Sequence, residues 1–217
     1  MKKILLAIDE SRVTYGEESI RLFEQTFIDK GVRRQVYRVR DSPSAKDLIE
    51  ESRFADLIVI KTDLSFDNTP AHPVKDVLAG AECPVIIMPF SLSGIEQVVF
   101  TYDGSRSAVF AIKQFTYLFP ELADKKAIVL QVNDNRDMPL SEKEKIADLL
   151  KTHYSGIGFQ VLQGNTHDEL FHYFLDKTHT LVVMGAFGRS WLSNLIKPSS
   201  ASLLLKRIHL PFFIAHH

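Results

Sequence analysis

Short apolar runs of strand length alternate with amphipathic stretches of helical length along the chain. In its second half the apolar runs predict strands at Gln97–Tyr102, Ala127–Val132, Phe159–Leu162, Leu181–Met184 and Phe212–Ala215. Between them, helical spacing predicts helices over Ser107–Phe119 and after Ser141, Thr166 and Pro198. At Ser141 and Thr166 the pattern is that of a capping box. Strands alternating with helices through short turns indicate an α/β fold, with a parallel sheet covered by helices on both faces.

The first half follows a shorter version of the same order. Its predicted strands are Lys2–Ile8, Gln35–Arg38, Leu57–Lys61 and Val85–Met88, and its predicted helices are Tyr15–Lys30, Ser44–Arg53 and Pro73–Ala81. Compared with the second half, it lacks one strand–helix unit.

Similar segments recur in the two halves. The strand ending near Asp9 resembles the one ending near Asp103, an offset of 94 residues, and the run at Leu57 resembles that at Leu181, an offset of 124. We therefore expect two units of one plan, covering residues 1–92 and 93–217. The last strand of each is strongly apolar, and exposed apolar edges need covering. These two strands are therefore expected to be covered by another part of the protein.

One turn in the second half is a candidate anion site. Gly185 and Gly188 follow an apolar strand, and Pro198-Ser199-Ser200 then opens a predicted helix. Glycine permits close approach of the backbone, while free amides and hydroxyls at a helix start can hold phosphate. An ordinary strand–turn–helix connection would have the same residues, and it is the simpler interpretation of this stretch taken alone.

Taken together, these features resemble the universal stress protein family. The resemblance is carried by a strand ending in Asp, by Gly-x2-Gly followed after nine residues by a small polar pair, and by a proline opening each last strand, Pro84 and Pro211. It implies two tandem flavodoxin-like, adenine-nucleotide alpha-hydrolase-like domains, the first of them degenerate. By the same resemblance, the last strand of each half would be an edge strand, and the two would pair with each other within the chain. The halves would then form an intrachain pseudo-dimer, and a homo-oligomer could follow.

The resemblance also implies a nucleotide site in the second half, with ATP or AMP as ligand and Mg²⁺ as a candidate companion of ATP. The implied binding residues come from strand ends and from the glycine turn: Thr101, Tyr102, Asp103, Val132, Met184, Gly185, Gly188, Arg189, Ser199 and Ser200. Arg189 could equally be a solvated loop charge.

Two departures from the family pattern bear on this site. Pro198 stands where the family has its third glycine, and because proline has no amide hydrogen, weaker nucleotide binding is expected. The first half has no glycine after Leu57–Lys61, and Asp63 and Asp67 there would repel a triphosphate. We expect no nucleotide site in the first half, and Asp9 is more simply a strand-end capping residue.

Composition narrows the remaining possibilities. The 26 basic and 27 acidic residues give a net charge of −1, which argues against a nucleic-acid partner held by a general basic field. Apolar runs are too short for a membrane span, and the single cysteine, Cys83, suits a reducing cytoplasm and reads as a core residue rather than a nucleophile.

Three hypotheses for function remain. The first is a stress-response protein that binds an adenine nucleotide as a regulatory or structural ligand. The second is a non-nucleotide stress or scaffold protein that acts through protein partners. The third is a slow ATP hydrolase or nucleotide-transfer enzyme, for which the sequence offers no clear catalytic base or metal-binding motif.

Overall fold

A computed structural model describes residues 3–9, 33–39, 45–61, 73–88, 94–133, 142–185 and 210–215 of the chain. The strands are β1 (Lys3–Asp9), β2 (Arg33–Val39), β3 (Leu57–Lys61), β4 (Val85–Met88), β5 (Gln97–Thr101), β6 (Lys126–Asn133), β7 (Ile157–Gln163), β8 (Thr180–Met184) and β9 (Phe212–Ile214). The helices are α2 (Ala45–Ser52), α3 (Pro73–Gly80), α4 (Arg106–Leu118), α5 (Lys143–Lys151) and α6 (Thr166–Leu175), with a 3₁₀ turn at Pro120–Leu122. The helices predicted over 15–30 and from 198 onward, and the boundary at 92/93, lie outside the described residues.

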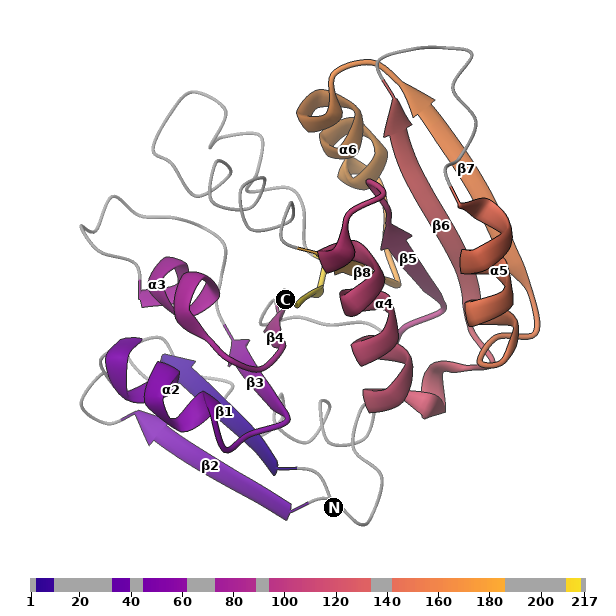
Figure 1. Ribbon diagram of the computed structural model, residues 1–217. Coiled ribbons are helices and arrows are strands. Elements are labelled where there is room, and N and C mark those ends of the chain that lie inside the picture. Colours follow the sequence, from indigo (N-terminus) through magenta and orange to yellow (C-terminus); the bar gives the residue numbers. More distant parts are fainter. Residues whose placement is uncertain are drawn as a thin grey trace.

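The strands form one sheet in the order β2-β1-β3-β4-β9-β8-β5-β6-β7 (Figure 1). Neighbouring strands are parallel except at the centre, where β4 and β9 pair antiparallel and Ile86 lies opposite Phe213. The pairing confirms the expectation that the two apolar last strands contact each other within the chain. Each of the two is the outermost strand of its own half, as expected, and their pairing places them at the centre of the joined sheet and leaves β2 and β7 at its edges.

The strand order relates the two halves. Reading outward from the central pair, the first half runs β4-β3-β1-β2 and the second runs β9-β8-β5-β6-β7. Among the described strands, the first half therefore has a counterpart for each strand of the second half except β7. This agrees with the prediction that the first half lacks one strand–helix unit.

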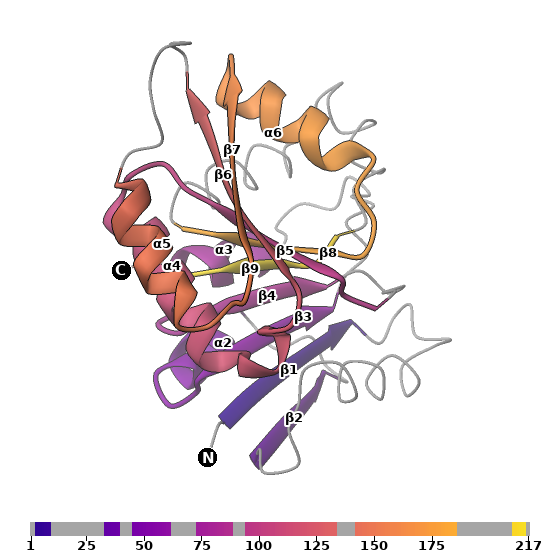
Figure 2. The ribbon, with the colours of Figure 1, turned by 90° about the vertical axis from the view of Figure 1, so that its right-hand side faces the viewer.

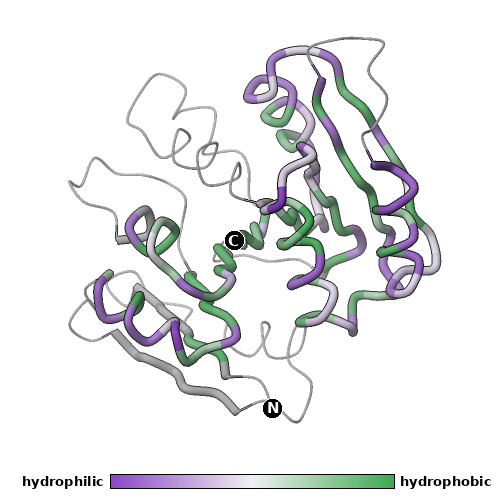
Figure 3. Tube along the Cα trace, viewed as in Figure 1, coloured by the Kyte–Doolittle hydropathy of each residue, from purple (hydrophilic) through white to green (hydrophobic). Residues whose placement is uncertain are grey.

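Helices cover both faces of the sheet, as predicted. Figure 2 shows α4 and α5 on one side of β5, β6 and β7, with α6 on the other. Each face has its own apolar cluster, one containing Phe100 and Phe115 and the other containing Leu130 and Phe174. The apolar colouring accordingly follows the strands and the inner sides of the helices (Figure 3).

Aromatic rings hold β9 in place from both faces. Phe213 meets Phe115 of α4 edge to face, with ring centroids 5.2 Å apart. On the opposite face, Phe212 meets Phe174 of α6 at 6.4 Å. Both β9 rings are almost completely buried. Alternation along a strand sends successive side chains to opposite faces, so these two adjacent residues join β9 to helices on both sides of the sheet.

Candidate functional site

The order of the strands itself indicates where a ligand would bind in the second half. The chain passes from β5 to β6 on one side, while β8 lies on the other side of β5. A crevice forms outside the carboxyl ends of parallel strands where the strand order reverses in this way. Here that point lies between the ends of β5 and β8.

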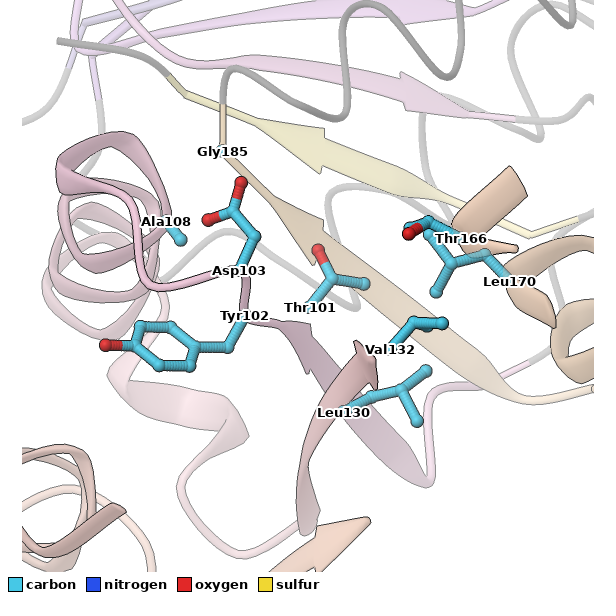
Figure 4. A pocket seen from close by; sticks show the side chains of 9 residues that line it. All are labelled: Thr101, Tyr102, Asp103, Ala108, Leu130, Val132, Thr166, Leu170 and Gly185. Atoms are coloured by element: carbon cyan, nitrogen blue, oxygen red, sulfur yellow. The ribbon is translucent and has the colours of Figure 1, made fainter. Parts of the chain in front are cut away.

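A pocket occupies this position (Figure 4). It encloses about 80 Å³ and continues into open solvent. One water needs about 10–15 Å³, so the enclosed part could hold a fragment of a ligand such as a ring, but not a whole nucleotide. The residues that line it are Thr101, Tyr102, Asp103, Ala108, Leu130, Val132, Thr166, Leu170 and Gly185. Five of these, namely Thr101, Tyr102, Asp103, Val132 and Gly185, are among the predicted site residues.

The end of β5 supplies two polar side chains on the pocket side. The Thr101 hydroxyl donates to the Val183 carbonyl oxygen of β8 at 3.2 Å, which ties the two strands together at the pocket. Asp103 is exposed, and one of its carboxylate oxygens accepts from the Ser105 amide at 2.9 Å. Gly104 between them has φ 80°, a left-handed conformation that glycine adopts without strain. The turn therefore fixes the Asp103 carboxylate beside the pocket.

Tyr102 faces the other way. Figure 4 shows its ring pointing away from Thr101 and Val132. The ring is buried in the cluster under α4 and α5, and its hydroxyl donates to a Glu142 carboxylate oxygen at 3.0 Å. Only the main chain of Tyr102 can therefore take part in this pocket.

Gly185 directly follows β8 and lies against the first turn of α4. A Cβ placed on it would lie 2.5 Å from the Ala108 nitrogen and 2.6 Å from the Ser107 carbonyl carbon. The glycine is therefore required by the packing of the strand end against helix backbone, whatever the pocket binds. Met184, one residue earlier, is fully buried in the apolar cluster and is not among the lining residues.

The side of the pocket next to β6 and α6 is mostly apolar. Leu130 and Val132 come from β6, and Leu170 comes from α6. Thr166, at the start of α6, adds a hydroxyl. Sequence reasoning identified Val132 but missed Leu130, Thr166, Leu170 and Ala108. Helical spacing places Leu170 one turn after Thr166, but only the packing of α6 against β6 shows that both reach the pocket.

The predicted phosphate-binding residues cannot be placed. Gly188, Arg189, Ser199 and Ser200 lie outside the described residues, as does Pro198. The Asp63 and Asp67 argument for the first half also concerns residues outside that range. The phosphate cradle and the absence of a first-half site therefore stay predictions.

Other chemistry finds little support in the described part of the chain. Burial raises the pKa of the Cys83 thiol to about 12, so the thiol stays protonated at neutral pH and is a poor nucleophile. No group of three or more His, Cys, Asp or Glu side chains that could hold a metal ion occurs among the described residues. None of the helices that the structure describes is long and apolar enough to cross a membrane.

The fold defines the class of protein. Along its whole length the chain superposes on a universal stress protein from Archaeoglobus fulgidus, with a TM-score of 0.63, 15% identity and 86% of that structure covered. A second such structure, from Pseudomonas aeruginosa, gives a TM-score of 0.50 at 16% identity, with 98% of this chain and 82% of that structure covered. At these identities the structures establish the fold alone: a mostly parallel α/β sheet of the universal stress protein type.

Sequence similarity indicates the same kind of protein. The chain is 27% identical over 133 residues to a universal stress protein of Synechocystis, a match that covers 59% of this chain and 45% of that protein. The chain thus matches less than half the length of this curated relative. No protein-family model matches the chain. The fold and the sequence similarity together confirm the resemblance to the universal stress protein family.

Proposed function

We propose that this universal-stress-type protein binds an adenine nucleotide, ATP or AMP, in the pocket between β5 and β8, as a regulatory or structural ligand. The observation that carries the proposal is the meeting of Thr101, Asp103, Val132 and Gly185 around one cavity. These residues are up to 84 positions apart, from Thr101 to Gly185, and the family resemblance had assigned all four to the ligand. Their convergence at the switch point of the sheet supports a common binding role.

The chemistry of the walls suits the two ends of a nucleoside. Leu130, Val132 and Leu170 offer an aliphatic surface to a planar base. Asp103 offers a carboxylate, an acceptor for the ribose hydroxyl groups. The phosphates would lie toward the chain that follows Gly185, where Gly188 and Ser199 are the proposed contacts. Pro198 removes one amide donor there, so we expect weak binding, with AMP losing less than ATP.

The size of the Asp103 contribution can be stated. A hydrogen bond to a charged group is worth about 1.5–3 kcal/mol, or about 10- to 150-fold in affinity. Asp103→Asn keeps an oxygen that can accept from the Ser105 amide while it removes the charge. The variant is therefore expected to fold as the wild type does and to bind AMP at least about 10-fold more weakly.

Thermal unfolding with AMP, ATP and Mg²⁺-ATP tests the proposal. A ligand that binds only the native state at 100 times its Kd stabilises it by about 2.7 kcal/mol, which is about 5–11 °C for a chain of this size. Calorimetric titration of wild type and Asp103→Asn with AMP gives the affinities. The nucleotide proposal fails if neither nucleotide shifts the wild-type midpoint at millimolar concentration.

The small size of the pocket favours a second candidate function, in which the protein binds no nucleotide. The enclosed volume of about 80 Å³ is small for a nucleotide, as expected of a pocket that no longer serves one. In that case the protein would act as a stress or scaffold protein through protein partners, with its two halves forming an intrachain pseudo-dimer around β4 and β9. Unfolding midpoints that are the same with and without nucleotide would favour this alternative.

A further inference from the structure

Thr166, the first residue of α6, does not cap the helix. The residue before it, Asn165, has an extended backbone, and its side-chain oxygen accepts from the amides of His167 at 2.9 Å and Asp168 at 3.4 Å. Asn165 therefore performs the capping that the sequence pattern had assigned to Thr166. The Thr166 hydroxyl takes no part in this cap.

Thr166 lies instead on the wall of the pocket. It lines the cavity together with Leu170, which stands four residues later on the same face of α6. In Figure 4, Thr166 lies beside Leu170 and above Val132, with Thr101 on the opposite side. Of the lining residues that β6 and α6 supply, Leu130, Val132 and Leu170 are apolar and Thr166 alone is polar.

The two threonines differ in what they can offer a ligand. The hydroxyl hydrogen of Thr101 is already given to the Val183 carbonyl oxygen, so toward the pocket Thr101 can act as an acceptor. The Thr166 hydroxyl can turn to donate or to accept. A single hydroxyl on an otherwise aliphatic wall discriminates well, since a ligand without a matching polar atom leaves it unpaired.

We propose that Thr166 is a specificity-determining residue of this pocket and that its hydroxyl forms a hydrogen bond with a polar atom on the edge of the bound base. This inference rests on the proposed adenine-nucleotide function and names the residue that reads the base. The layout of the pocket gives the expected place of the base. In the proposed binding mode, the ribose and phosphates lie toward β8 and Gly185, so the base lies on the opposite side, next to β6 and α6. A base packed on Val132 and Leu170 would present its edge to Thr166.

The test compares Thr166→Val, which keeps the shape of the side chain and removes the hydroxyl, with Thr166→Ser, which keeps the hydroxyl. AMP affinity is measured by calorimetric titration. Thr166→Val should bind AMP about 3- to 10-fold more weakly, and Thr166→Ser should bind it as the wild type does. Thr152→Val is the matched control, since the exposed Thr152 hydroxyl donates to the Leu149 carbonyl on α5, and its AMP affinity should not change.

A second measurement separates recognition of the base from a structural effect. AMP analogues that each lack one polar atom of the base edge, namely the exocyclic amine, N1, N3 or N7, are titrated into wild type and Thr166→Val. One analogue should bind the wild type more weakly than AMP does, while Thr166→Val should bind that analogue and AMP equally well. This result would show that the missing atom and the hydroxyl are partners. A purely structural role would weaken AMP and all the analogues alike.

The outcomes also keep the two proposals apart. If wild type binds AMP and Thr166→Val binds it equally well, the role of Thr166 is refuted while the nucleotide function stands. Equal weakening of AMP and every analogue likewise refutes base recognition by Thr166. If wild type binds no adenine nucleotide, both proposals fail together.

Discussion

Replacing Gly185 by alanine tests how the end of β8 packs against α4. The new Cβ would lie 2.5 Å from the Ala108 nitrogen, 2.6 Å from the Ser107 carbonyl carbon and 2.8 Å from the Ala108 Cα, closer than the 3.0 Å below which real Cβ atoms essentially never come. All three atoms belong to the backbone, so no side chain can rotate away. The first turn of α4 would have to move, together with its capping bond from the Ala108 amide to the Ser105 hydroxyl.

The expected cost follows from this geometry. Overpacking a tight site costs about 1–3 kcal/mol, and a clash with backbone belongs in the upper part of that range. We expect Gly185→Ala to lower the free energy of unfolding by about 2–3 kcal/mol. At about 2–4 °C per kcal/mol for a chain of this size, the midpoint of thermal unfolding should fall by about 4–12 °C.

Urea unfolding with a matched glycine variant provides the assay. Gly156→Ala is the control, because nothing lies within 4 Å of its added Cβ. This variant should be unchanged or more stable by up to about 1 kcal/mol, owing to the reduced freedom of its unfolded chain. The urea midpoint of Gly185→Ala should fall with little change in the m-value. Equal midpoints for the two variants would show that β8 and α4 do not approach each other as described.

Two further predictions concern packing and charge. Phe213→Ala should lower the free energy of unfolding by about 3–5 kcal/mol, because the ring is fully buried at the centre of the sheet. Urea unfolding measures this loss, and a loss below about 1 kcal/mol would contradict the packing. Hydrogen bonds from Lys145 and Tyr102 lower the pKa of Glu142 below its ordinary 4.5, so this carboxylate stabilises the fold above that pH and loses its contribution as the pH falls through the lowered pKa. The stability difference between wild type and Glu142→Gln should accordingly be constant above about pH 5 and shrink on acidification, whereas a difference independent of pH would count against the contact.

The buried strands could be predicted from the sequence because they are nearly continuous apolar runs. The predicted bounds of Leu57–Lys61 and Val85–Met88 are those of β3 and β4. A strand covered on both faces has no polar side to interrupt the run, and turn residues mark its ends. The contact of β4 with β9 was expected from the family resemblance, and their apolar character agrees with it because exposed apolar edges need covering. Its antiparallel direction was not predicted.

The starts of two helices were wrong for different reasons. At α6 the pattern Thr166-x-x-Glu169 fits a capping box, but Asn165 is an equally good cap one residue earlier, and the structure uses it. At α5 the predicted cap was Ser141, whereas the helix begins at Lys143 after Glu142 with φ 53°. The Glu142 side chain is held by the hydroxyl of Tyr102, a contact 40 residues distant that no local pattern contains.

The pocket could be predicted only where a residue ends a strand. The family resemblance assigned Thr101, Asp103 and Gly185 to the ligand, and all three stand at carboxyl ends of strands, where open α/β sheets bind their ligands. Leu130 and Leu170 are ordinary core residues by their pattern. They reach the pocket only because α6 lies over β6, which is a fact of packing rather than of spacing.

The registers of the two half-sheets bear on the prediction that the first half has no nucleotide site. Ile8 of β1 pairs with Lys61 of β3, while Phe100 of β5 pairs with Val183 of β8. Two residues further along, Tyr102 stands at the level of Gly185. Tyr102 corresponds to Ile8 by the offset of 94 residues, so Gly185 corresponds to Lys61. At that level a Cβ would overlap the backbone at the start of α4. Lysine has a Cβ where the second half has a glycine, so the first-half sequence lacks the residue that permits this close approach in the second half. A site built like the second one would therefore require glycine at position 61 as well as in the turn that follows.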